Sequence, residues 1–100
     1  MKMTNTDILE IIQSINIKSG LVNPIHYYKN GGCYIFAKQL QSLVGGKLRY
    51  LTLEQHFVLE VNGKLYDASG NVTKVYKDNK YITESEFLMR PKLCKGIEMY

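Results

Sequence analysis

The sequence predicts an α+β fold in which N-terminal helices pack on an antiparallel β-sheet. Up to Val44, apolar residues recur at three- and four-residue spacing, as they do on one face of a helix. From Lys47 onward they alternate along the chain, as they do in strands. The pair Asn62-Gly63 lies between two alternating runs and is the strongest short-range signal of a β-hairpin. Helices followed by a separate block of strands are typical of the α+β class.

Two helices are expected before the sheet. The first spans residues 4–20, with Thr4 and Asp7 as a capping box and Gly20 as its stop. Its apolar stripe consists of Ile8, Ile11, Ile12 and Ile15. The second begins at or next to Cys33 and ends at Gly45-Gly46. Its apolar face consists of Phe36, Leu40 and Leu43, flanked by Ala37 and Val44. Residues 21–32 are rich in Asn and Gly and are expected to form a surface connection.

The rest of the chain is expected to form the sheet and one short helix. The candidate strands are residues 47–54, 56–61, 64–69 and 71–76, with a possible edge strand at residues 92–100. After the polar turn at residues 77–80 the chain has room for a further strand. Thr83 and Glu86 form a second capping box, which predicts a short helix before Pro91.

The composition describes a single globular domain that spans residues 1–100. Hydrophobic residues make up 45% of the chain and aromatic residues 11%, which is too apolar for a disordered protein. No apolar run approaches the roughly 20 residues that a membrane helix needs, so no membrane association is expected. Asp7 and Glu10 interrupt the first apolar stretch, which does not fit a secretory signal. We therefore expect a cytoplasmic protein.

The formal net charge of +4 does not indicate a nucleic-acid partner. The lysines are spread along the chain without a run, and arginine, which most often contacts base edges, occurs only as Arg49 and Arg90. A dispersed, solvated lysine surface is the simpler explanation. Nucleic-acid binding is therefore not expected.

The two cysteines, Cys33 and Cys94, are expected to be free thiols because they lie far apart in a chain of cytoplasmic type. The spacing of cysteine and histidine residues does not match a structural zinc site, and no metal or organic cofactor is implied. An isolated cysteine is most simply a small buried apolar residue. We interpret Cys94 in this way, and we expect His26 at the surface rather than in a site.

Cys33 differs from Cys94 because it lies at the predicted start of a helix, directly after Gly31-Gly32. Unpaired backbone N–H groups and the positive end of the helix dipole favour a thiolate at such a position. The two glycines are expected to leave the approach open and to let the backbone come close to a substrate. The same N–H groups are suited to holding the oxygen of a tetrahedral intermediate. Cys33 is therefore the candidate nucleophile.

The hairpin supplies a base and a carboxylate. If Asn62 and Gly63 are the turn residues, Val61 faces Lys64 and the pairing runs back from there. Six side chains then share one face: His56, Val58, Glu60, Leu65, Asp67 and Ser69. His56 and Asp67 become diagonal neighbours whose Cα atoms lie about 7–8 Å apart, close enough for a hydrogen bond between imidazole and carboxylate. Such a bond fixes the tautomer of the ring and raises the basicity of its other nitrogen.

The order of these residues resembles the papain-like cysteine fold in its small permuted forms. These include the transglutaminase-like core, the arylamine N-acetyltransferases and the NlpC/P60-type peptidases. GGCYIFAKQL resembles the helix start that carries the nucleophile, HFVLEV the histidine strand and NGKLYDASG the strand that ends in aspartate. The resemblance covers residues 31–70, and it departs from the family pattern at Tyr34 and Val58, where tryptophan is common.

The resemblance implies a papain-like cysteine protease core that works without a cofactor. It implies that Cys33 is the nucleophile, His56 the general base and then acid, and Asp67 the carboxylate that orients the imidazole. The reaction would be hydrolysis or acyl transfer at an amide or acyl bond, with a protein, a peptide or a small acyl compound as substrate. Peptide cleavage, deamidation and acyl transfer share this machinery.

Three alternatives remain open from the sequence. Each residue has a purely structural explanation: Cys33 as a buried helix residue, His56 as a strand-end histidine, and Asp67 as a carboxylate that caps the bend at residues 68–70. The short chain also fits a binding module without catalytic activity, such as a phage or mobile-element protein that docks on a host protein. A zinc site built from the same three residues is the last alternative.

Overall fold

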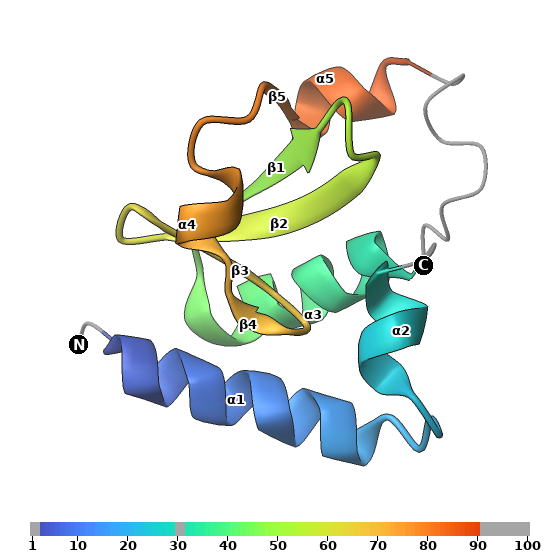
Figure 1. Cartoon of the computed structure of the whole chain (residues 1–100), viewed down its shortest axis with the longest axis vertical. Helices are drawn as coiled ribbons and strands as arrows, with labels where there is room; N and C mark the ends of the chain where they lie inside the picture. The colour runs from blue at the N-terminus through green and yellow to red at the C-terminus, as the bar shows by residue number, and fades with distance from the viewer. Residues whose placement is uncertain (1–2, 30–31, 91–100) are drawn as a thin grey trace.

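Helices come first along the chain and a five-stranded antiparallel sheet follows, as an α+β fold requires (Figure 1). The structure is a computed structural model, and it describes residues 3–29 and 32–90. The helices are α1 (Asn5–Lys18), α2 (Pro24–Lys29), α3 (Cys33–Val44), α4 (Thr73–Tyr76) and α5 (Glu84–Leu88). The strands are β1 (Lys47–Leu51), β2 (His56–Val61), β3 (Lys64–Asp67), β4 (Gly70–Asn71) and β5 (Tyr81–Thr83). Their order in the sheet is β4-β3-β2-β1-β5, which confirms the predicted fold class.

Helix α1 begins and ends where the sequence predicts. The Asp7 backbone N–H donates to Thr4 Oγ1 and the Thr4 N–H donates to Asp7 Oδ2, each over 3.1 Å, so the capping box is confirmed. The chain leaves the helix through Gly20, whose φ of 74° is a conformation that favours glycine. Ile8 and Ile12 are buried in the core, and the other two isoleucines of the stripe are partly buried and pack against it.

Polar side chains of α1 attach this helix to the far edge of the sheet. Asn5 Oδ1 accepts hydrogen bonds from the Tyr66 hydroxyl and from Asn71 Nδ2, each over 2.8 Å. Asn16 Nδ2 donates to the backbone carbonyl of Ala68 over 3.0 Å. These hydrogen bonds hold the end of β3 and the residues that follow it against α1.

The prediction of a plain surface connection over residues 21–32 was wrong, because residues 24–29 form α2. Pro24 occupies the first helical position, where its missing N–H costs nothing, and Asn23 Oδ1 accepts from the His26 N–H over 3.2 Å. Tyr28 is buried, and its ring centroid lies 5.0 Å from that of Phe36. The Asn-Pro pair was thus a helix start. His26 is exposed, as expected.

The main core lies between α3 and one face of the sheet. Its largest members on the sheet side are Leu48, Tyr50, Phe57, Leu59 and Tyr66. Phe87 of α5 closes this core, with its ring centroid 4.5 Å from that of Tyr50. Leu43, predicted on the buried face of α3, is 56% exposed. The inward-facing stripe instead runs at four-residue spacing from Phe36 and Leu40, which are buried, to the partly buried Val44, and this turns Leu43 to the side.

The hairpin has the predicted register. Val61 pairs with Lys64, Glu60 with Leu65 and Leu59 with Tyr66. The two turn residues both have positive φ, 53° at Asn62 and 78° at Gly63, as a type I′ turn requires. The alternation of side chains along β2 and β3 is therefore the one that the sequence predicted.

The prediction of a strand over residues 71–76 was wrong beyond Asn71. Asn71 Oδ1 accepts from the Thr73 N–H over 3.0 Å and from Thr73 Oγ1 over 2.7 Å, and Thr73 Oγ1 in turn accepts from the Leu65 N–H over 2.9 Å. These side-chain bonds compete with strand pairing and turn the chain into α4. A strand does follow the turn at residues 77–80, as β5. The capping box of Thr83 and Glu86 is confirmed at the start of α5.

Helix α4 covers a second, smaller apolar cluster on the face of the sheet opposite α3 (Figure 1). This cluster consists of Leu51, Val58 and Val72, with Leu65 and Tyr76 at its margin. The possible edge strand at residues 92–100, and Cys94 with it, lie outside the described residues. In residues 3–29 and 32–90, no helix is both long and apolar enough to span a membrane.

Candidate active site

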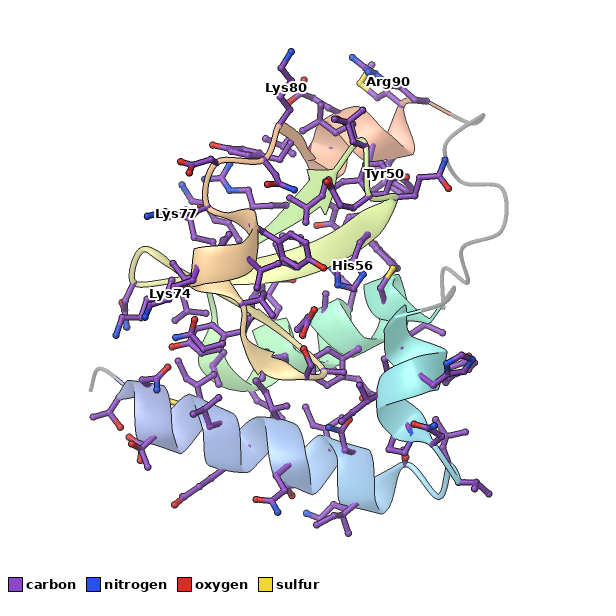
Figure 2. All side chains as sticks on the ribbon, viewed as in Figure 1. Tyr50, His56, Lys74, Lys77, Lys80 and Arg90 are labelled. Atoms are coloured by element: carbon purple, nitrogen blue, oxygen red, sulfur yellow. The ribbon has the colours of Figure 1, made fainter. Side chains whose placement is uncertain are left out.

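The fold brings the three predicted site residues to one end of the sheet. Cys33 is the first residue of α3, His56 the first of β2, and Asp67 the last of β3. Because β2 and β3 are antiparallel, the start of one lies beside the end of the other. In the view of Figure 2, the His56 side chain lies between the ribbons of β2 and α3.

His56 and Asp67 are in direct contact, as their predicted positions on the hairpin require. His56 Nε2 lies 2.9 Å from Asp67 Oδ2, and the two residues are only 4% and 2% exposed. The other carboxylate oxygen, Oδ1, accepts from the Ser69 N–H over 2.8 Å and from Ser69 Oγ over 2.5 Å. Asp67 therefore caps the bend that follows β3 and holds the imidazole at the same time.

The environment of His56 favours the protonated ring. Burial lowers the pKa of His56, but hydrogen bonds with Asp67 and Cys33 and the negative charge of both groups raise it more, so that the pKa rises from 6.5 to about 9. Burial likewise raises the pKa of Asp67, whereas the hydrogen bonds from His56 and Ser69 lower it, and the net pKa is lower than usual. At neutral pH the buried pair is thus an imidazolium and a carboxylate.

The Cys33 side chain lies close enough to His56 to raise the pKa of the imidazole, through a hydrogen bond and through its charge. Since Nε2 of His56 is occupied by Asp67, the ring nitrogen left for the sulfur is Nδ1. Helix α3 begins after Gly32, which provides no side-chain cap for its first N–H groups. Cys33 is a free cysteine and is only 2% exposed. Its burial agrees with the alternative that this residue is a buried part of the helix.

Gly32 has a different role from the open approach that the sequence predicted. A Cβ atom at this position would lie 2.5 Å from the ring of Tyr27, and the Gly32 N–H donates to the Tyr27 carbonyl over 3.1 Å. The missing side chain therefore lets the end of α2 pack directly against the start of α3. Gly32 positions Cys33 through this contact. Gly31 lies outside the described residues.

Tyr76 lies beside the candidate site, and the sequence did not predict its position there. It ends α4, and its ring centroid lies 5.9 Å from that of His56. Burial and the negative charges of Asp67 and Glu54 raise the pKa of its hydroxyl. The residue was missed because residues 71–76 were predicted as a strand. The polar pair Asn71 and Thr73, which is typical of a turn, was the signal that this segment leaves the sheet.

The alternative of a zinc site finds no support in the part of the chain that the structure describes. No group of three or more His, Cys, Asp or Glu side chains in residues 3–29 and 32–90 is placed to hold a metal ion. In the observed arrangement, Asp67 Oδ2 bonds to the imidazole, and Oδ1 is held by Ser69.

Comparison with known proteins identifies a family and gives no further relative. No curated protein matches the chain, and no solved structure matches it. The model of the Phage YunG-like protein family matches residues 8–92, a range that includes Cys33, His56 and Asp67. Since this match covers most of the 100 residues, the chain belongs to the family of Phage YunG-like proteins.

Proposed function

We propose that this protein is a thiol-dependent hydrolase or acyl transferase that acts on an amide or acyl bond. The observation that carries the proposal is that the buried imidazole of His56 hydrogen-bonds Asp67 and interacts with the side chain of Cys33, which is the first residue of α3. The papain-like or transglutaminase-like resemblance fits the same arrangement. The substrate would be a protein, a peptide or a small acyl compound, and the expected compartment is the cytoplasm.

In the proposed reaction, the Cys33 sulfur attacks the carbonyl carbon and forms a carbon–sulfur bond. A pKa of about 9 means that His56 carries a proton at neutral pH, so an imidazolium stands beside the sulfur that attacks. His56 then gives this proton to the leaving amine as the carbon–nitrogen bond breaks, which leaves a thioester. Water or a second amine attacks the thioester, His56 takes the proton of this nucleophile, and the Cys33 sulfur is released.

Asp67 and the start of α3 would support these steps. Asp67 keeps Nδ1 of His56 directed at the sulfur and stabilises the positive ring, because both of its oxygens are held in place. The first N–H groups of α3, with no side-chain cap at Gly32, are suited to the developing oxyanion. His56, as an imidazolium paired with the Asp67 carboxylate, would therefore act first as the proton donor to the leaving amine.

One observation favours the second candidate, a binding module without catalytic activity. Cys33 is 2% exposed. Neither Cys33 nor His56 lines the hollow between α1 and α3 or the hollow beside α4. In such a module, the same side chains would form a buried polar network that rigidifies the end of the sheet. The phage named in the family description fits the origin that this alternative assumes.

Alkylation with iodoacetamide tests the proposal, with each cysteine followed by peptide mass spectrometry. We expect Cys33 to react much faster than Cys94 at pH 6–7. An ordinary thiol loses about tenfold in rate for each pH unit below a pKa of about 8.5, whereas a thiolate paired with imidazolium keeps its rate. In His56→Ala the advantage of Cys33 should disappear. His26→Ala, which changes the other histidine on the exposed side of α2, is the matched control and should retain it.

Equal labelling rates at the two cysteines, or a Cys33 rate that does not depend on His56, would contradict an activated thiol. Circular dichroism of His56→Ala and His26→Ala at the same temperature shows whether both variants are folded. A binding module, by contrast, would keep its affinity for its partner in Cys33→Ser.

A further inference from the structure

A hollow of about 200 Å³ lies on the face of the sheet that α4 covers. Leu51 and Leu65 contribute apolar surface, and Tyr76 and Tyr81 contribute aromatic rings. Three charged residues line it, Arg49, Glu60 and Lys77, and the first two are paired with each other. Arg49 Nε lies 2.9 Å from Glu60 Oε1, and the guanidinium group stacks 4.4 Å above the ring of Tyr81.

This hollow is next to the candidate active site. Leu51 pairs with His56 across β1 and β2, so the lining of the hollow begins one strand away from the imidazole. Leu65 points to the same face of β3 as Asp67, since the two residues are separated by two positions. Tyr76 is shared, because its ring lies beside that of His56 and also lines the hollow.

The size and lining of the hollow suit one large apolar group. Pockets for drug-sized ligands begin at roughly 300 Å³, so a hollow of about 200 Å³ takes a group the size of a side chain. The leucines offer apolar contact and the two tyrosines offer ring edges and faces, which is the environment that aromatic side chains prefer. Arg49 is already bonded to Glu60, and the third charged residue of the lining, Lys77, adds the apolar stem of its side chain.

We propose that this hollow receives an aromatic or long aliphatic side chain of a peptide substrate whose backbone reaches the Cys33 site. The proposal rests on the proposed function, and it narrows the substrate class to peptides or proteins that carry such a side chain near the reacting bond. The apolar lining supplies the binding energy, and Tyr76 forms the wall between the bound side chain and His56.

The test uses aza-peptide epoxides, which carry peptide on both sides of the electrophile, with Phe placed at one position at a time in an otherwise Gly peptide. We expect Phe at one position to increase the rate of Cys33 labelling about tenfold or more over the Gly peptide, from burial of its ring. Leu65→Trp fills the hollow and should abolish this advantage. Leu43→Trp, in a separate hollow of about 380 Å³ beside α1, is the matched control and should keep it.

Iodoacetamide separates this proposal from the proposed function, because it needs no hollow. If iodoacetamide labels Cys33 in a His56-dependent way but Phe has no advantage at any position, the hollow does not bind substrate and the thiol chemistry stands. If Leu65→Trp retains the full Phe advantage while folded, the side chain binds elsewhere and the proposal is wrong. Should Leu65→Trp fail to fold, Tyr81→Ala carries the test, because removal of this exposed wall should lower the Phe advantage severalfold.

Discussion

Raising the pH from 6 to 9.5 should destabilise this protein, because it removes the proton that His56 holds between Cys33 and Asp67. The pKa of His56 is about 9 in the folded chain and 6.5 for an ordinary histidine, so the folded state binds this proton more tightly than the unfolded state. The resulting stability is fully present below pH 6.5 and is lost as the pH rises through about 9. Asp67 has a lowered pKa, so its own contribution is constant over this range.

The size of the effect follows from the two pKa values of His56. A difference between 6.5 and about 9, at about 1.4 kcal/mol per pH unit, corresponds to about 3 kcal/mol of unfolding free energy. This is a large part of the roughly 5–15 kcal/mol that stabilises a small domain. The groups that face the imidazole are Asp67, Cys33 and Tyr76. The pKa of Tyr76 is raised above 10, so measurements up to pH 9.5 leave its hydroxyl protonated.

Urea denaturation at pH 6, 7.5 and 9.5, followed by circular dichroism, measures this dependence. With urea m values of about 1–3 kcal/mol/M, a loss of about 3 kcal/mol lowers the midpoint by about 1–3 M. Asp67→Asn removes the charge that holds the proton and should flatten most of the dependence, whereas His26→Ala should leave it unchanged. Cys33→Ser removes one of the two partners that raise the pKa of His56, so the decrease of stability with pH should remain but become smaller.

A wild-type midpoint that stays constant from pH 6 to 9.5 would refute the reasoning, since it would mean that His56 has the same pKa in the folded and unfolded chains. A midpoint that rises with pH would show that burial of the imidazole outweighs both of its partners.

Three further predictions concern the contacts that position the site. Gly32→Ala forces a methyl group into the ring of Tyr27 and should lower the free energy of unfolding by about 1–3 kcal/mol in urea denaturation. The loss should be smaller in a Tyr27→Ala background, and equal losses in the two backgrounds would refute the contact. Phe87→Ala empties a fully buried position and should cost about 3–5 kcal/mol, so a melting temperature close to that of the wild type would contradict its place in the core. Thr4→Ala removes the side-chain cap of α1 and should cost about 1 kcal/mol by the same denaturation, whereas no change would mean that the capping box does not contribute.

The face of the hairpin that carries His56 and Asp67 could be predicted because it depends on a few adjacent residues. Two residues with positive φ, Asn62 and Gly63, determine the turn, and strand alternation then decides which side chains share a face. The start of α3 at Cys33 was predictable for a similar reason, since the preceding glycine and the apolar spacing are both local. These two local features are enough to nominate the three site residues.

Other features of the site depend on contacts between distant parts of the chain. The burial of Cys33 and the role of Gly32 both involve the packing of α2, a helix that the sequence analysis interpreted as a connection. The position of Tyr76 depends on a hydrogen bond from the Leu65 N–H to a threonine on the next segment. None of these contacts leaves a periodic pattern in the sequence.

The sequence by itself therefore determined the fold class, the two capping boxes and the hairpin register, because caps, turns and alternation are decided by neighbours along the chain. For the same reason it could nominate Cys33, His56 and Asp67 as a candidate group. Only the tertiary structure decided that these side chains are buried, that Tyr76 lies against the imidazole, and that a hollow lies one strand away. The physical reason is that burial and charge coupling depend on which surfaces meet after folding, and residues far apart in the sequence supply those surfaces.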